Sequence, residues 1–261
     1  MITQNPVNSQ FRNNQLNKRA TQNPNRNWKT RLKNIWVGWR SLLIFIVLML
    51  IFRSVFADWN HVPTGSMNPG IIGGDRVVVD KIAYDIRWPF SFKRIFRWSD
   101  PNRGDIVTVD SPEEDQNQLL IKRVIGIPGD TVELRQNRLI INATEATYVQ
   151  VTEAEVRSLN LPPPGNDLYF WETIFDEVRI VKWIPRHTSR DSSFGPITLG
   201  TDEYFIMGDN RDNSRDSRRI GLIERDRIIG RAHTIAFSID FKGHDGIPLR
   251  PRFRRFFTYL L

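Results

Sequence analysis

The feature that most restricts the fold of this 261-residue chain is an uninterrupted apolar run near its beginning, LLIFIVLMLIF at 42–52. With its flanks, 35–56, the segment comprises about 22 residues, which as an α-helix would be about 33 Å long, roughly the thickness of a hydrocarbon core. Side chains suited to the lipid headgroup region stand near both ends: Arg40, Arg53, Trp36, Trp39 and Trp59. We therefore predict a transmembrane anchor at 35–56.

Charge is distributed unevenly along the chain. Residues 1–40 contain eight Lys and Arg residues and no acidic residue, so the whole net charge of +8 lies ahead of the apolar run. Basic residues on one flank of a span mark its cytoplasmic side. The remainder is formally neutral, which argues against a nucleic-acid-binding surface. We expect 1–34 to be a disordered basic cytoplasmic tail and 57–261 to lie on the extracytoplasmic face.

A cleaved secretory signal is the alternative interpretation of this segment, because its central run has the length of a signal-peptide core. No A-x-A-like cleavage site follows, since the chain continues Ser-Val-Phe-Ala-Asp at 54–58. An uncleaved, single-pass anchor is therefore favoured.

Beyond the anchor, Val- and Ile-rich segments bounded by Gly, Pro, Asn or Asp predict strands. These segments are 75–85, 104–110, 118–127, 130–142 and 202–209, with a hairpin turn at 135–137. Thr152 and Glu155 predict a capping box for a short helix at 153–159. Residues 143–198 are otherwise polar and irregular. The predicted fold is mainly β: an N-terminal transmembrane helix, then an antiparallel β-sheet catalytic domain at 57–261 with an inserted irregular subdomain at about 143–198.

Ser66 is the first candidate for chemistry, because it stands in PTGSMNPG at 63–70, a few residues after the predicted span. Gly65 permits close backbone approach, and Pro63 and Pro69 restrict the loop, so the hydroxyl can be held in one place. A serine in such surroundings can equally be an ordinary turn residue.

Lys122 is the second candidate, within QLLIKRVIGIPGD at 118–130. In a strand it shares a face with Leu120 and Val124, so it projects among aliphatic side chains. Burial there would disfavour the charged amine and lower its pKa from about 10.4 to about 8, as a lysine general base requires. The alternative is a lysine that extends to solvent from an edge strand.

A third segment, MGDNRDNSRDSRRIG at 207–221, is dense in Asp, Asn, Ser and Arg. It begins on an apolar strand, so these side chains can form a hydrogen-bond network that satisfies itself. A calcium loop is a rival interpretation, but the arginines between Arg211 and Arg219 and the missing EF-hand glycine argue against it. The chain also contains no cysteine. We expect no metal and no cofactor.

Taken together, five segments resemble, in order, the motif blocks of bacterial type I signal peptidases, which are serine proteases with a Ser/Lys dyad. The segments are PTGSM (63–67), GDRVVVDK (74–81), RGDIV (103–107), IKRVIGIPGD (121–130) and GDNRDNSRDSR (208–218). The resemblance implies a membrane-bound serine endopeptidase that removes N-terminal signal peptides from exported preproteins outside the cytoplasm.

The resemblance also implies a role for each matching residue. Ser66 would be the nucleophile and Lys122 the general base, while the Ser66 backbone N–H and the Thr64 hydroxyl would hold the oxyanion. Ser214 would orient the Lys122 amine. A salt-bridge scaffold around the site would consist of Asp216, Arg218 and Arg123. Residues 209–212 would be structural.

Two departures from the family pattern leave local packing open. Ile220 stands where the family usually has an aromatic residue, and Gly70-Ile71 replaces the more usual Thr-Leu. A serine–histidine triad is a further alternative, but no triad motif surrounds any of the four histidines: His61, His187, His233 and His244. The Ser-x-x-Lys pattern of penicillin-binding enzymes is absent, because Pro69 stands where that pattern has its lysine.

Substrate is expected to bind as an extended strand along edges near 61–67 and 118–123. The resemblance implies small residues, usually Ala, at positions −1 and −3 of the cleavage site. Met67, Leu120 and Val124 are candidates to line the two pockets.

The segment 84–100 interleaves aromatic with basic side chains and fits no clean helical or strand period. We predict that it enters the membrane interface beside the active site through Trp88, Phe90, Phe92, Phe96 and Trp98. The alternative is that this segment is a loop that covers the core. For residues 250–261, too, both membrane contact and a loop over the core remain open.

The expected partners are preprotein signal peptides and the lipid bilayer, with no nucleic acid, and the chain is expected to be a monomer. Two other functions remain open. One is a catalytically inert, membrane-tethered β binding domain, and the other is a Ser/Lys self-cleaving regulator of related fold, which would not need the anchor.

Overall fold

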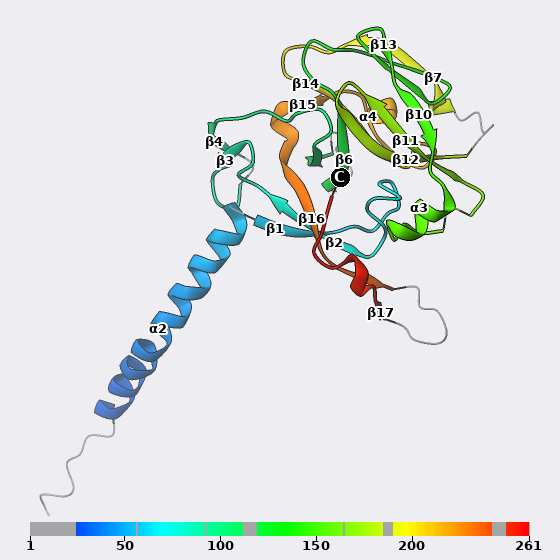
Figure 1. Cartoon of the computed structure of the whole chain (residues 1–261). Coiled ribbons are helices and arrows are strands. Elements are labelled where there is room, and N and C mark those ends of the chain that lie inside the picture. Colours follow the sequence, from blue (N-terminus) through cyan, green and yellow to red (C-terminus); the bar gives the residue numbers. More distant parts are fainter. Residues whose placement is uncertain are drawn as a thin grey trace, which may run out of the picture. The chain divides into compact units, whose positions relative to one another are not determined.

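The computed structural model describes residues 25–55, 57–91, 93–111, 119–163, 165–184, 190–241 and 249–260. They belong to two compact units, Met1–Ile51 and Phe52–Leu261. The first unit contains most of a single long helix, and the second contains all the described strands (Figure 1).

The long helix is α2 (Asn25–Val55). Its part Trp36–Ser54 has a mean hydropathy of 1.8 and is long and apolar enough to cross a membrane. The side chains from Trp36 to Leu50 are exposed. The helix begins earlier than the predicted anchor, because residues 25–34, assigned to the tail, contain no Gly or Pro that would break it.

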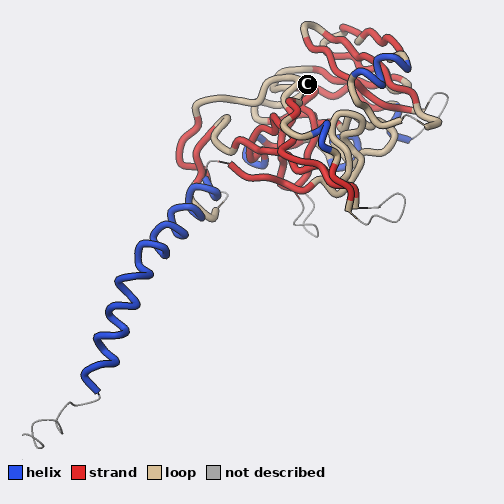
Figure 2. The backbone as a smooth tube through the Cα atoms, turned by 60° about the horizontal axis from the view of Figure 1, so that its bottom comes forward, coloured by secondary structure: helices blue, strands red, loops and turns tan. Residues whose placement is uncertain are grey.

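An antiparallel sheet forms the centre of the second unit, which Figure 2 shows to be built mainly of strands. Its strand order is β1 (Ala57–His61), β2 (Asp75–Asp80), β16 (Ile228–Asp240), β5 (Ile106–Asp110), β6 (Leu119–Gly126), β14 (Glu203–Met207) and β15 (Ile223–Glu224). The short strands β17 (Arg250–Pro251) and β18 (Thr258–Tyr259) also pair with β16. Along β2 the side chains alternate between buried and half-buried, as its VVV sequence favours on a half-covered face.

Three smaller sheets extend this centre. One has the order β13 (Phe194–Thr198), β7 (Thr131–Arg135), β8 (Arg138–Ile141) and β9 (Thr144–Glu145). A second consists of β10 (Thr147–Gln150), β11 (Leu168–Ile174) and β12 (Glu177–Trp183). The third is the hairpin β3 (Asp85–Arg87) and β4 (Arg94–Arg97).

The other helices among the described residues are short. They are α3 (Glu153–Ser158), α4 (Ser217–Ile220) and the 3₁₀ turns Arg190–Ser192, Arg225–Arg227 and Phe253–Arg255. The predicted capping box is present at α3, where Glu155 N–H donates to the Thr152 hydroxyl and the Glu155 carboxylate accepts from Thr152 N–H. The predicted hairpin turn is also confirmed, because Gln136 and Asn137 join β7 to β8 with φ of 50° and 66°.

The insertion at 143–198 is more regular than its sequence suggested. LYFWETI and EVRIVKW form β11 and β12, which pair along their full length and are joined by Phe175-Asp176. Aromatic and β-branched residues favour both strands, and each strand buries part of its side chains. The pattern is hidden in the sequence by the charged residues within it, Glu172 and Arg179, both of which are buried.

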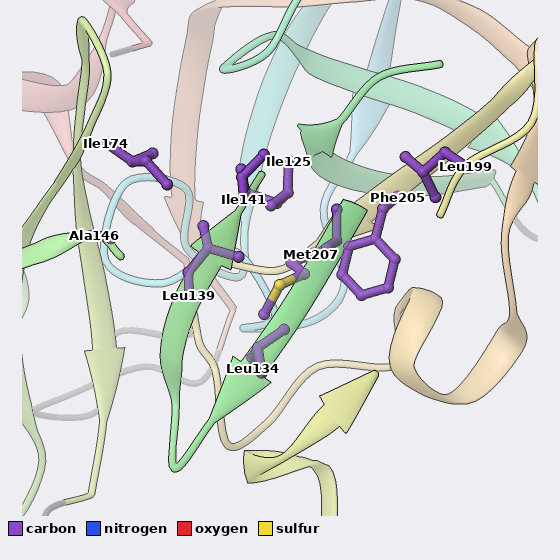
Figure 3. Packing of buried hydrophobic residues seen from close by; sticks show 10 residues of the cluster. Ile125, Leu134, Leu139, Ile141, Ala146, Ile174, Leu199, Phe205 and Met207 are labelled. Carbon is purple, nitrogen blue, oxygen red and sulfur yellow. The ribbon is translucent and has the colours of Figure 1, made fainter. Parts of the chain in front are cut away.

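Within the described ranges, the buried apolar side chains form three hydrophobic clusters. One fills the space between β6, β7, β8 and β14, where Figure 3 shows Ile125, Leu134, Leu139, Phe205 and Met207 close together. A second joins the loop after β1 to β2, β5 and β6 through Met67, Ile71, Val77, Ile106 and Ile121. A third joins β5, β6 and β14 through Val107, Val124 and Ile206. The second cluster fixes the loop that contains Ser66 to the central sheet.

Candidate active site

Ser66 lies in a tight loop between β1 and β2. Asn68 N–H donates to Gly65 O over 3.1 Å, and Ile71 N–H donates to Met67 O over 3.0 Å. Met67 and Ile71 are both completely buried in the second cluster, so they anchor the loop on either side of its turn. Ser66 itself is only 9% exposed.

Lys122 lies in β6 with its amine directed at this loop. Its Nζ atom is 2.9 Å from Ser66 Oγ and 2.9 Å from the carbonyl oxygen of Ile121. In the sheet Lys122 is paired with Val107 of β5, and only 3% of it is exposed. The structure therefore brings the two predicted residues together in a site almost free of bulk water.

The surroundings of Lys122 set its protonation state. Burial lowers the pKa of its amine from 10.5 to about 8, although the negative charges of Asp216 and Asp209 oppose the shift. A charged amine loses hydration in such a site, which favours the neutral form. Close to neutral pH a useful fraction of the amine can therefore accept a proton.

The predicted oxyanion donor Thr64 also faces the nucleophile. Its hydroxyl lies 3.5 Å from Ser66 Oγ, while the rest of the residue is exposed. The histidines that the structure describes have other neighbours, since His61 packs against Phe241 and His233 shares a hydrogen bond with Thr234. His187 and His244 lie outside the described residues.

Two separate buried ion pairs support the site. The sequence predicted a single salt-bridge scaffold of Asp216, Arg218 and Arg123. Arg123 binds Asp209 through two hydrogen bonds of 2.9 and 2.8 Å. Arg218 binds Asp216 through two of 2.8 Å. Arg123 pairs with Asp209 because the β6–β14 register sets it opposite Met207, two positions before that carboxylate.

Asp216 is fixed from three directions. Besides Arg218, it accepts from Gly208 N–H over 2.9 Å and caps the start of α4. Although burial raises the pKa of its carboxyl, Arg218 and the Gly208 N–H outweigh that effect and lower the pKa. The lowered pKa favours the carboxylate form, whose negative charge acts on the amine of Lys122.

Gly208 separates Ser66 from the predicted orienting residue Ser214. A Cβ atom at position 208 would lie 2.3 Å from Ser214 Oγ and 2.4 Å from Ser66 O. Ser214 is buried, and the described hydrogen bonds of Lys122 Nζ go to Ser66 and Ile121. Close packing through a glycine, which sequence reasoning missed, thus sets the distance between Ser66 and Ser214.

Asn210 is a second residue that sequence reasoning did not assign to the site. Its N–H donates to Ser66 O and its Nδ2 atom donates to Gly65 O, each over 3.0 Å. The signal for it was its place in the motif GDN, next to an apolar strand. Two residues later, Asp212 accepts a hydrogen bond from Ile184 N–H over 2.7 Å, which is consistent with a structural role.

The three pocket candidates lie in different environments. Met67 and Val124 are completely buried in separate hydrophobic clusters, and Leu120 is partly exposed. Beside Leu120, the residues Leu119–Lys122 of β6 pair with β5 on one side, whereas β14 joins the other side only from Arg123 onward. Among the described strands, none pairs with that second side of β6 at 119–122.

The aromatic segment forms the hairpin β3–β4 and its flanks. Trp88, Phe90, Phe96 and Trp98 are 64%, 73%, 63% and 48% exposed, and Phe92 lies outside the described residues. The base of the hairpin is held by buried Asp85, which forms ion pairs of 3.0 to 3.1 Å with three arginines: Arg87, Arg94 and Arg225. The hairpin is thus firmly attached while its aromatic side chains face outward.

Comparison with known proteins identifies the family of this chain. A family model described as "Signal peptidase, peptidase S26" matches residues 35–237. A signal peptidase I of Pseudomonas fluorescens is 34% identical over 207 residues, covering 75% of this chain and 69% of that protein. A signal peptidase I of Buchnera aphidicola is 30% identical over 269 residues, covering 88% of this chain and 85% of that protein.

Among solved structures, a signal peptidase I from Enterococcus faecalis V583 is 28% identical to this chain. The match covers 51% of this chain and 97% of that one, with a TM-score of 0.30. The family relationship therefore depends on the sequence matches, of which the family model covers residues 35–237, from the predicted anchor into β16.

Proposed function

This chain belongs to the signal peptidase family, peptidase S26, and from that premise we propose that Ser66 and Lys122 are its catalytic pair. The protein is a serine endopeptidase that removes signal peptides from preproteins. The observation that supports the residue assignment best is the 2.9 Å separation between a buried amine and a buried hydroxyl. Such a pair, shielded from water, meets the geometric requirement for a nucleophile and its base.

The first chemical step is the attack of Ser66 on the scissile carbonyl. With the Lys122 amine neutral, the Ser66 O–H donates to its lone pair, and an N–H of the same amine donates to Ile121 O. As Oγ bonds to the carbonyl carbon, its proton moves to Nζ. The alkylammonium that forms is stabilised by the nearby anions Asp216 and Asp209, whose charges raise the pKa of the amine.

The carbonyl oxygen becomes an anion in this step. The Ser66 backbone N–H and the Thr64 hydroxyl are the donors that we assign to it, since the first belongs to the nucleophile itself and the second lies 3.5 Å from Ser66 Oγ. Preorganised donors of this kind are each worth about a hundredfold or more in rate. Lys122 then gives its proton to the leaving amine as the C–N bond breaks and the acyl-enzyme forms. In the second half of the reaction it takes a proton from the water that attacks the acyl-enzyme, and it returns this proton to Ser66 Oγ as the ester bond breaks.

The substrate backbone is proposed to add as a strand to the open side of β6 at 119–122. Main-chain hydrogen bonds there would hold the peptide extended beside Ser66, independent of its sequence. Leu120, which is partly exposed next to that edge, is the pocket candidate that remains accessible. The substrate side chains at −1 and −3 would have to fit against the surface beside this edge. Selectivity for small residues would arise because that surface leaves room only for small side chains.

The membrane arrangement is a further part of the proposal. The basic residues before Trp36–Ser54 would remain in the cytoplasm, and the catalytic unit would act on the extracytoplasmic face as a monomer. The exposed aromatic side chains of the β3–β4 hairpin would contact lipid. In support, within the second unit Phe90 N–H donates to Ser54 Oγ over 2.8 Å, so the hairpin tip contacts a residue close in sequence to the apolar segment.

The direct experiment is to incubate residues 57–261 in detergent with one preprotein and to measure the masses of the products. A single cut after an Ala-x-Ala site is expected, and it should disappear in Ser66→Ala and Lys122→Met proteins that remain folded by circular dichroism. Cleavage by a folded Ser66→Ala protein at the wild-type rate would contradict the proposed nucleophile.

A further inference from the structure

The inserted sheet β10–β11–β12 contains a buried ionic cluster centred on Glu172. The carboxylate of Glu172 is 0% exposed and accepts from Arg211 Nη2 over 2.7 Å and from Arg179 Nε over 2.6 Å. It also accepts from the Tyr148 hydroxyl over 2.7 Å. Arg179 and Tyr148 belong to the inserted sheet, whereas Arg211 belongs to the motif segment that reaches the active site. The cluster therefore connects the insertion to that segment.

The position of the Arg211 guanidinium depends on Glu172. Its side chain is 0% exposed, and within the part of the chain that the structure describes its Nε and Nη1 atoms find no hydrogen-bond partner. Burial raises the pKa of Glu172, but Arg211 and Arg179 outweigh burial and lower it to about 2, so the carboxylate is charged at any working pH. Removing one partner from such a cluster leaves an uncompensated buried charge.

Backbone hydrogen bonds hold the same segment against β12. Lys182 N–H donates to Asp209 O, and Arg211 N–H donates to Lys182 O, each over 2.8 Å. Asn210, between them, forms an isolated parallel bridge with Lys182. The insertion thus fixes the residues on both sides of Asn210, by backbone contacts at Lys182 and by the ion pair at Arg211.

Asn210 passes this constraint on to the nucleophile loop. Its backbone N–H donates to Ser66 O and its side-chain amide donates to Gly65 O. These bonds fix the peptide groups on both sides of the Ser66 Cα atom. A displacement of about 1 Å at a reacting group can reduce a rate by about a hundredfold.

We propose that Glu172 is a positioning residue for signal-peptide cleavage: through Arg211 and Asn210 it holds the Ser66 backbone at the distance from Lys122 that the reaction needs. The inserted sheet then belongs to the catalytic framework. The inference relies on the proposed role of Ser66 as the nucleophile.

The test compares three variants of the full-length protein in detergent, with a preprotein that contains an Ala-x-Ala site. Glu172→Gln keeps the shape but removes the charge, and Glu172→Asp keeps the charge but withdraws the carboxylate by one methylene. Asp167→Asn is the matched control, because it removes an acidic partner of the same insertion that pairs with the Lys182 ammonium instead of Arg211. The values of kcat and KM are measured at a temperature well below the Tm of each variant.

We expect kcat to fall about ten- to a hundredfold in Glu172→Gln and about threefold or more in Glu172→Asp, with KM within about twofold of wild type. The pH at half-maximal rate should stay unchanged, because the charges that act on the Lys122 amine are those of Asp216 and Asp209. Asp167→Asn should match wild type in all three quantities.

The proposal is overturned if folded Glu172 variants keep the wild-type kcat, or if KM rises while kcat is unchanged. If Glu172→Gln fails to fold, Glu172→Asp decides the question alone. Failure of the proposed nucleophile would be seen separately, as activity retained by Ser66→Ala, whatever the Glu172 variants do.

Discussion

The amine of Lys122 lies 2.9 Å from the hydroxyl of Ser66, although the two residues are 56 positions apart in the chain. Ser66 belongs to a loop that Met67 and Ile71 anchor in the core, and Lys122 belongs to a strand in the middle of the sheet. Neither residue has to rely on a mobile segment for its position. The proximity is therefore a property of the folded sheet, and the predictions below follow from it.

Replacing Lys122 by Met should abolish cleavage and stabilise the fold. At pH 7 the folded wild-type protein holds an amine whose pKa burial has lowered from 10.5 to about 8. That difference corresponds to roughly 3 kcal/mol of destabilisation, which an apolar side chain of similar length avoids. Urea unfolding at pH 7 should show the higher free energy of unfolding in the variant.

The stability difference should also depend on pH in a defined direction. Because the folded pKa is the lower one, the unfolded chain binds more protons between pH 8 and 10.5. Wild-type stability should therefore rise relative to Lys122→Met across this interval, until the difference has largely disappeared. Lys93→Met, at an exposed lysine, is the control and should change stability by less than about 0.5 kcal/mol. If the Lys122→Met protein were less stable than wild type at pH 7, burial of the Lys122 amine would not destabilise the folded protein, and the prediction would be wrong.

Replacing Gly208 by Ala should strongly reduce kcat. The added Cβ would lie 2.4 Å from Ser66 O and 2.3 Å from Ser214 Oγ, and the first of these atoms is backbone that cannot rotate away. The Ser66 loop must shift, so we expect a rate loss of about a hundredfold and a destabilisation of about 1–3 kcal/mol.

Gly70→Ala is the matched control for this glycine. It lies in the same loop as Ser66, but a Cβ there would approach no atom closer than 3.8 Å. Its kcat should stay within about threefold of wild type at equal folding. Equal activity of the two alanine variants would refute the packing argument at Gly208.

The aromatic hairpin should contribute to lipid binding. In residues 57–261, which lack the apolar helix, replacing Trp88 and Phe90 by Ser removes two of the most exposed aromatic side chains. Cosedimentation with liposomes should fall about tenfold or more, since each side chain buried in the interface is worth about 1.5–3 kcal/mol. Replacing Val149 and Phe175, exposed residues of the inserted sheet, is the control, and binding equal in all three proteins would assign the hairpin another role.

Much of the site could be predicted from local sequence, because its chemistry is concentrated in short motifs. The burial of Lys122 was predicted from the aliphatic residues around it in the strand, although from Ile121 onward the structure buries both faces of β6. The restricted loop around Ser66 follows from its prolines and glycines. The positions of the strands could be predicted for the same reason, because β2, β5, β6 and β14 are rich in Val, Ile and other large apolar residues.

What local sequence could not supply is which side chains meet across the fold. The pairing of Arg123 with Asp209 depends on the register between β6 and β14, and a motif does not encode a register. The link from Glu172 to Arg211 spans 39 positions and joins an insertion to a motif block. Gly208 shows the same limit, because its requirement for a hydrogen side chain comes from Ser66, which is remote in sequence.

The pH dependence of kcat/KM of the full-length protein, measured between pH 6 and 10, tests most directly whether Lys122 is the base. Protonated amine cannot accept the Ser66 proton, so kcat/KM should rise about tenfold per pH unit at low pH and level off around a midpoint of about 8. A midpoint near 6.5, the ordinary value for histidine, or a rate that does not change with pH would contradict the mechanism.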